Sequence, residues 1–125
     1  MSGGQQPIQI GSADLQDHKA LTSKEFAFVK ANGTSLKGRY FIINVVAAPD
    51  HKTRLGIIVS KRFNNKAVKR NRARRLIREC FRLLQHGCKE PIWIVIIARK
   101  MLHDASLQDV QKDFIKQLQN DGHYK

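Results

Sequence analysis

The sequence predicts an α+β fold in which helices pack on a small mixed central sheet. Two segments rich in aromatic and β-branched residues, at 38–47 and 54–60, and a continuous apolar run at 92–98 are typical of strands. Segments with apolar residues at helical spacing lie before, between and after them. We therefore expect the order α-β-β-α-β-α in one domain, since 125 residues suffice for a hydrophobic core.

The first helix is expected to begin near Thr22 or Ser23, because either hydroxyl can cap its N-terminus. Phe26 and Val29 would share the apolar face of this helix. The dipeptide Asn32-Gly33 would end it.

The strand candidates differ in their surroundings. Pro49-Asp50-His51 joins the first two, and such a short connection favours an antiparallel pair. The third, at 92–98, is apolar throughout, which is typical of a strand covered on both faces at the centre of a sheet.

The last helix is expected to follow Ser106, a suitable N-cap. Val110, Phe114, Gln117 and Leu118 fall at helical spacing after it. We expect these residues to share the face that packs on the sheet.

The most informative segment runs from Lys61 to Arg78, where nine of the eighteen residues are basic and none is acidic. The whole chain has 23 Lys and Arg against 10 Asp and Glu, a formal net charge of +13. Like charges repel, so this crowding is expected where an external polyanion such as a nucleic-acid backbone neutralises it. Because Arg binds phosphate in a bidentate way and stacks on unpaired bases, its dominance favours RNA over duplex DNA.

A central helix is expected from Asn65 or Lys66 to Leu84 or Gln85. Cations occupy its first turns, where the helix dipole disfavours them but free backbone N–H groups would bind a phosphate. The face opposite its core face holds almost only Arg, which suits recognition of RNA shape and backbone rather than of bases. Its expected core face consists of Ala73, Leu76, Ile77, Cys80, Leu83 and Leu84.

The chain is therefore expected to form a single RNA-binding domain over residues 18–121. Residues 1–17 are rich in Gly, Gln and Ser, so we expect a flexible N-terminal tail. Residues 122–125 would form a short C-terminal tail.

Composition and spacing disfavour several other functions. The acidic residues are scattered, so we expect no catalytic residues in the protein itself. Cys80 and Cys88 are eight apart, and a buried Cys80 thiol is favoured over a zinc site that would include His86. The run at 92–98 is too short to span a bilayer, and the N-terminus lacks a signal peptide. We expect a cytoplasmic protein with no metal site, no membrane partner and no small-molecule substrate.

Charge and size alone leave two alternatives open. One is a structural rRNA-binding protein of the ribosome. The other is a protein that binds acidic membranes through the amphipathic central helix. The second alternative is weaker because Leu76 and Ile77 are expected in the core.

The segment AVKRNRARRLIRE, at 67–79, resembles the RNR signature of the bacterial ribonuclease P protein subunit. Residues 55–62 resemble the strand that leads into that helix, and residues 96–100 resemble the strand that follows it. Phe26 and Gly33-Thr34-Ser35 resemble the first helix and its end. The order of these segments along the chain makes the resemblance specific.

The resemblance implies a role in tRNA maturation. The partner of the family is a large catalytic RNA, which with its Mg²⁺ ions removes the 5′ leader of precursor tRNA, and the protein alone is not catalytic. The protein binds beside that active site and holds the single-stranded leader across its sheet. The implied fold includes a left-handed βαβ crossover, contrary to the usual right-handed rule.

The resemblance also implies site residues by position. A base would stack on Phe26 in the leader cleft, although a place in the core is an open alternative for this residue. Phe28, Tyr40 and Asn44 would assist, and Lys30 stands where the family often has a second aromatic residue. The expected RNA-contacting set is Lys61, Arg62, Lys66, Lys69, Arg70, Asn71, Arg72, Arg74, Arg75 and Arg78.

Overall fold

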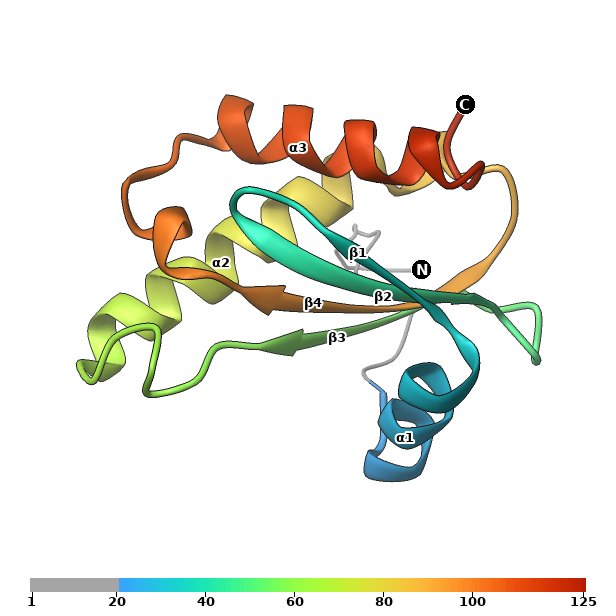
Figure 1. Cartoon of the computed structure of the whole chain (residues 1–125), viewed down its shortest axis with the longest axis horizontal. Helices are drawn as coiled ribbons and strands as arrows, with labels where there is room; N and C mark the ends of the chain where they lie inside the picture. Colours follow the sequence, from blue (N-terminus) through green and yellow to red (C-terminus); the bar gives the residue numbers. More distant parts are fainter. Residues whose placement is uncertain (1–20) are drawn as a thin grey trace, which may run out of the picture.

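The computed structural model describes residues 21–125 and confirms the α+β class. In Figure 1, α1 lies on one face of a single sheet, and α2 and α3 lie on the other. The expected tail over 1–17 lies outside the described residues. The elements are α1 (Ser23–Asn32), β1 (Thr34–Lys37), β2 (Phe41–Ala47), β3 (Arg54–Ile58), α2 (Ala67–Leu84), η1 (Gln85–Gly87), β4 (Ile92–Ala98), η2 (Lys100–Asp104) and α3 (Leu107–Asn120).

The four strands form a mixed sheet in the order β1-β2-β4-β3. β4 is antiparallel to β2 and parallel to β3, which confirms the central position predicted for the apolar run. The expected pairing of β2 with β3 is wrong, because β4 lies between them, where both of its apolar faces are covered. β3, α2 and β4 form the expected βαβ crossover, whose left hand stays a prediction.

β1 is a strand that the sequence pattern does not reveal. Its four residues are mostly exposed, so they show no alternation of buried and exposed positions. It pairs antiparallel with β2, with Thr34 opposite Val45 and Lys37 opposite Ile42. Gly38, expected within the strand at 38–47, instead lies in the connection between β1 and β2.

Alternate strand residues enter two separate cores. Ile43 and Ile94 belong to the main core, which lies between the sheet and the pair α2 and α3. Trp93 and Val95 belong to a smaller core beneath α1, together with Val29. Each face of β4 is thereby covered, and the face beneath α1 carries the candidate cleft described below.

The helix boundaries agree closely with the expected ones. Thr22 caps α1 and Gly33 ends it, and Ser106 caps α3. The buried residues of α3 are those expected, namely Val110, Phe114, Gln117 and Leu118. Within residues 21–125, no helix combines the length and apolarity needed to cross a membrane.

The core face of α2 differs from the expected one at two positions. Ala73, Ile77 and Cys80 are buried as predicted, but Phe81 is fully buried and Leu83 is 43% exposed. The face is rotated toward Phe81 because α3 packs on that side, where the rings of Phe81 and Phe114 meet edge to face with centroids 6.1 Å apart.

The C-terminal residues 122–125 pack against the domain instead of extending from it. The Lys89 N–H donates to the His123 carbonyl, and the Lys125 N–H donates to the Gly87 carbonyl, both at 2.8 Å. Tyr124 packs against the main core.

The two cysteines are free thiols in the main core and at its margin. Burial, with a smaller effect of the Asp113 charge, raises the pKa of Cys80 to about 12. Burial raises the pKa of Cys88 to about 11. Both thiols therefore stay protonated at neutral pH, as the predicted buried thiol of Cys80 requires.

Candidate nucleic-acid interface

The N-terminus of α2 lacks the capping side chains and the acidic residue that the other two α-helices have in their first turns. α1 and α3 each begin with a capping box, completed by Glu25 and Asp109 respectively. α2 begins after Lys66, whose side chain makes no capping hydrogen bond, and its first turn contains no acidic residue. Its free N–H groups and the neighbouring cations are together suited to bind a phosphate.

Among the described residues, no carboxylate forms an ion pair with a cation of the segment 61–78. Within residues 21–125 the ion pairs involve Arg54, Arg82 and two histidines, and none involves these nine residues. All nine except Arg70 and Arg74 are exposed. The positive charge on this side of the molecule is thus available to an external polyanion.

The two half-buried arginines have structural contacts. Arg70 Nη1 donates to the carbonyl of Asn64 at 3.0 Å. Arg74 donates from Nη2 to the carbonyl of Val59 at 3.4 Å and from Nη1 to Asn71 Oδ1 at 3.1 Å. The bonds to the carbonyls of Asn64 and Val59 hold the β3–α2 connection against the helix. The bond to Asn71 orients the Arg74 side chain in the free protein.

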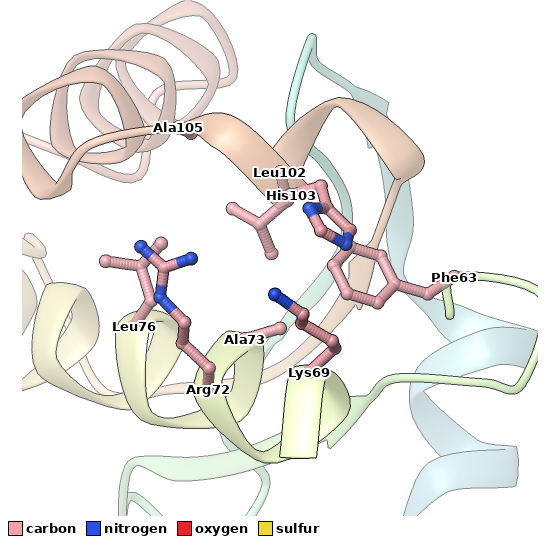
Figure 2. A pocket seen from close by; sticks show the side chains of 8 residues that line it. All are labelled: Phe63, Lys69, Arg72, Ala73, Leu76, Leu102, His103 and Ala105. Carbon is pink, nitrogen blue, oxygen red and sulfur yellow. The ribbon is translucent and has the colours of Figure 1, made fainter. Parts of the chain in front are cut away.

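The same connection is held from its other side by η2 (Figure 2). The ring of Phe63 stacks on that of His103, with centroids 5.6 Å apart, and Asn64 Nδ2 lies 2.8 Å from His103 Nε2. Lys69 and Arg72 border a cavity of about 10 Å³ between α2 and η2. The start of the basic helix is therefore fixed by contacts from segments on both sides.

A cleft of about 220 Å³ opens between α1 and the sheet. Phe26 packs on the smaller core and also lines the cleft, so its place in the core does not remove it from the cleft, and base stacking on its ring stays a prediction. Its ring lies over Gly56, where a Cβ would come within 2.5 Å of a ring carbon. The remaining lining residues are Ala27, Lys30, Asn44, Ile58, Val95 and Ile97.

Two of the four residues expected in the leader cleft lie elsewhere. Phe26 and Asn44 line it, whereas the ring of Phe28 packs edge to face against Trp93, with centroids 5.6 Å apart. Tyr40 packs against the main core on the opposite face of the sheet, and its N–H donates to Asp113 Oδ2 at 3.2 Å. Aromatic character suggested Phe28 and Tyr40, but their directions remove them from the cleft.

A larger open hollow, of about 620 Å³, adjoins the cleft at Ile97, which lines both. Its basic lining residues are Arg62, which the sequence predicts, and Arg39, Arg99 and Lys100, which it does not. Arg39 and Arg99 lie 60 positions apart in the chain, and the pairing of Phe41 with Ala98 brings them to one end of the sheet. Only the strand order could have revealed this group.

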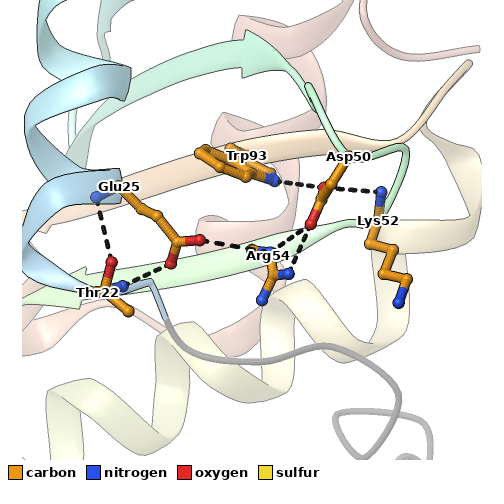
Figure 3. A network of polar contacts seen from close by, with 6 residues as sticks. All are labelled: Thr22, Glu25, Asp50, Lys52, Arg54 and Trp93. Carbon is orange, nitrogen blue, oxygen red and sulfur yellow. Dashed lines mark hydrogen bonds and ion pairs between the residues drawn. The ribbon is translucent and has the colours of Figure 1, made fainter.

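No group of three or more His, Cys, Asp or Glu within residues 21–125 is arranged to hold a metal ion. A different polar cluster surrounds Arg54 at the N-terminal end of α1 (Figure 3). Arg54 donates to Asp50, and Asp50 also accepts hydrogen bonds from Trp93 and from the Lys52 backbone.

We expect the Asp50 carboxylate to contribute stability that is lost as the pH falls from about 4 to about 2. Loss of water raises the pKa of Asp50, but hydrogen bonds from Arg54, Lys52 and Trp93 and the Arg54 charge outweigh this and lower the pKa to about 2. Because the pKa of Asp50 is lower in the folded than in the unfolded protein, its carboxylate stabilises the fold at pH values above the unfolded-state pKa. Protonation of the carboxylate at lower pH removes that contribution. Urea denaturation at several pH values should show wild type and Asp50→Asn converging in free energy of unfolding over this range. A constant difference between pH 5 and pH 2 would contradict the expectation.

Fold and surfaces together define a class: small, strongly basic α+β proteins in which a cation-rich crossover helix and an aromatic cleft are built on one mixed sheet. The family model described as ribonuclease P matches residues 16–121. The ribonuclease P protein component of Clostridium botulinum (strain Loch Maree / Type A3) is 33% identical over 111 residues, which are 88% of this chain and 99% of that protein. This chain belongs to the ribonuclease P protein component family.

Solved structures agree with this assignment. The RNase P protein of Staphylococcus aureus superposes with a TM-score of 0.74 at 26% identity, covering 86% of this chain and 98% of that one. The RNase P protein of Thermotoga maritima gives a TM-score of 0.71 at 28% identity, covering 81% and 96%. Membership of this family confirms the resemblance on the RNR segment and favours ribonuclease P over the ribosomal alternative.

Proposed function

We propose that this protein binds the catalytic RNA subunit of ribonuclease P and the 5′ leader of precursor tRNA, and so promotes removal of the leader. The RNA subunit with its Mg²⁺ ions carries the hydrolysis, and the protein supplies binding. The observation that carries the proposal is the uncompensated charge of the segment 61–78, which has no ion pair within residues 21–125.

The two surfaces suit different parts of an RNA substrate. The exposed face of α2 presents Arg72, Arg75 and Arg78, which match the phosphates of a folded RNA. The cleft combines the ring of Phe26 with the amide of Asn44, a combination suited to the unpaired bases of a single strand. We assign the RNA subunit to α2 and the leader to the cleft.

The basic hollow extends the proposed leader path. Ile97 lines both the cleft and the hollow, so a strand leaving the cleft at this residue would meet Arg39, Arg99 and Lys100. These cations could neutralise consecutive phosphates, while Lys30 neutralises one inside the cleft. The leader would thereby contact several elements rather than one.

Reconstitution tests the proposal. The protein should restore leader removal by the family's catalytic RNA at low Mg²⁺ concentration, where a structural rRNA-binding protein should not. Failure to bind that RNA or to restore processing would overturn the proposal. Cleavage of precursor tRNA by the purified protein without any RNA subunit would overturn the assignment of the chemistry.

We expect Phe26→Leu to weaken holoenzyme binding of precursor tRNA by about 1–3 kcal/mol, the range for loss of a base–aromatic stack. Leucine retains apolar packing on the smaller core but offers no ring. Affinity for mature tRNA, which lacks the leader, should be unchanged. Fluorescence titration of the reconstituted holoenzyme with both tRNAs measures the difference.

The matched control is Phe28→Leu. It makes the same change two residues further along α1, at a ring that packs on Trp93 outside the cleft. Equal effects of the two variants on the leader-dependent part of the affinity would show that the cleft does not bind the leader.

A further inference from the structure

The outward residues of β3 connect the cleft to the N-terminal end of α1. Arg54, Gly56 and Ile58 alternate along the strand and therefore share its face toward α1. Ile58 lines the cleft, Gly56 lies beneath the Phe26 ring, and Arg54 lies beside Glu25 of the first turn. One edge strand thus holds α1 and also forms part of the cleft.

Arg54 is held by contacts on several sides (Figure 3). Its Nε and Nη2 donate to Asp50 Oδ2 at 2.9 and 2.6 Å, and Nε lies 3.8 Å from Glu25 Oε2. Its guanidinium carbon lies 5.7 Å from the centroid of the Trp93 ring. The side chain is only 16% exposed, so salt screens these interactions less than it screens a surface ion pair.

Glu25 transmits this contact to α1. Its Oε1 accepts the Thr22 N–H at 2.7 Å, and Thr22 Oγ1 accepts the Glu25 N–H at 3.3 Å, which together form the capping box. The same carboxylate therefore closes the first turn and faces Arg54. Phe26 is the next residue, so a movement of Glu25 also moves the ring that lines the cleft.

Asp50 attaches the other end of the bridge to the sheet. Its Oδ1 accepts hydrogen bonds from Trp93 Nε1 at 3.0 Å and from the Lys52 N–H at 3.1 Å. Trp93 lies in β4, one of the two inner strands of the sheet. The carboxylate is thus held in position by two donors other than Arg54.

Among the described residues, α1 buries fewer side chains than the other two α-helices. Val29 is its only fully buried residue, whereas α2 and α3 bury four residues each. A ten-residue helix is not stable on its own, so its position depends on tertiary contacts. The polar bridge through Arg54 therefore joins the N-terminal end of α1 to β3, in addition to the packing of Phe26 and Phe28 on the sheet.

We propose that Arg54 is a positioning residue for leader binding: by bridging Asp50 and Glu25 it holds α1, and with it the Phe26 ring, at the height over β3 that accepts a leader base. The proposal rests on the proposed function of the cleft. Without the bridge α1 remains on its core but samples more positions. Base stacking must then restrict that motion, which lowers affinity.

The first test compares Arg54→Met with Lys52→Met in the reconstituted holoenzyme. Both remove one cation near the β2–β3 turn, but the Lys52 side chain points away from the network and only its backbone N–H takes part (Figure 3). The measured quantity is the ratio of affinities for precursor tRNA and mature tRNA. Arg54→Met should lower this ratio about three- to ten-fold, and Lys52→Met should leave it unchanged.

A second variant guards against unfolding of Arg54→Met. Glu25→Gln keeps an oxygen that can accept the Thr22 N–H but removes the charge that faces Arg54. It should lower the same ratio in the same direction with the helix retained. An unchanged ratio in Glu25→Gln and in any folded Arg54 variant would overturn the proposal.

A double variant distinguishes this inference from the proposed function. If Arg54 acts through Phe26, adding Arg54→Met to Phe26→Leu should not lower the ratio further. Losses that multiply would mean that Arg54 contacts the leader itself, and would overturn the positioning role. If Phe26→Leu alone has no effect, the leader assignment of the cleft fails first.

Trp93 provides an independent measurement, because it is the only tryptophan of the chain. It is 8% exposed, and its ring contacts Arg54 and Phe28. In the free protein, Glu25→Gln, which leaves Arg54 beside the Trp93 ring, should shift the Trp93 emission to longer wavelength, whereas Lys52→Met should not. An emission spectrum unchanged by Glu25→Gln would show that α1 keeps its position without the bridge, contrary to the proposal.

Discussion

Replacing Arg72, Arg75 and Arg78 together with alanine should weaken binding of the catalytic RNA on the order of a hundred-fold at about 0.1 M salt. All three are exposed and lack an ion pair within residues 21–125, so their loss removes phosphate contacts without breaking internal ones. Alanine favours helix, so α2 should persist. Arg70 and Arg74 are left intact because they donate to backbone carbonyls.

The salt dependence of binding makes this prediction specific. If the wild type contacts about six phosphates, log K should fall with log salt at a slope of roughly −4 to −5. Each lost contact should reduce the size of that slope by about 1. Mobility-shift titrations at four or five salt concentrations measure both the affinity and the slope.

The control removes the same number of charges from other surfaces. Lys24 of α1 and Lys112 and Lys116 of α3 are exposed and lie outside the basic segment. Their triple alanine variant should retain most of the affinity and nearly the full slope. Equal losses in the two triple variants would mean that net charge, and not the face of α2, determines binding.

The helices and the central strand could be predicted because each carries its own local pattern. Ser106 and the buried stripe of α3 are such a pattern, and so is the apolar run of β4. β1 carries none, since its residues are mostly exposed and gain their bonds only from β2. The place of β4 between β2 and β3 depends on pairing between distant segments of the chain. The short turn between β2 and β3 gives no indication that another strand lies between them.

The candidate sites differ in the same way. The basic face of α2 was predictable because its cations are neighbours in one continuous segment. The cleft was only partly predictable, because α1, β2, β3 and β4 each contribute to its lining. Tyr40 shows the difficulty: an aromatic residue beside a strand can enter either core, and its direction decides which.

Ile77→Asp should unfold the domain, whereas Leu83→Asp, six residues further along α2, should lower its stability by only about 1–2 kcal/mol, from lower helix propensity and an anion in the last turn. Ile77 is fully buried in the main core, so the variant must bury an unpaired carboxylate or lose packing, at a cost above about 4 kcal/mol. That cost is comparable with the whole stability of a small domain. Leu83 is 43% exposed, so a carboxylate there remains in water.

The contrast tests where the core face of α2 lies. At about 100° per residue, Leu83 is about 120° from Ile77, whereas Phe81 is only about 40° from it. Apolar character alone places Leu83 in the core, but packing of α3 against Phe81 turns the helix so that Leu83 faces water. Thermal unfolding followed by circular dichroism compares the two variants. Loss of the folded state in Leu83→Asp, or a folded and stable Ile77→Asp, would place the core face elsewhere on the helix.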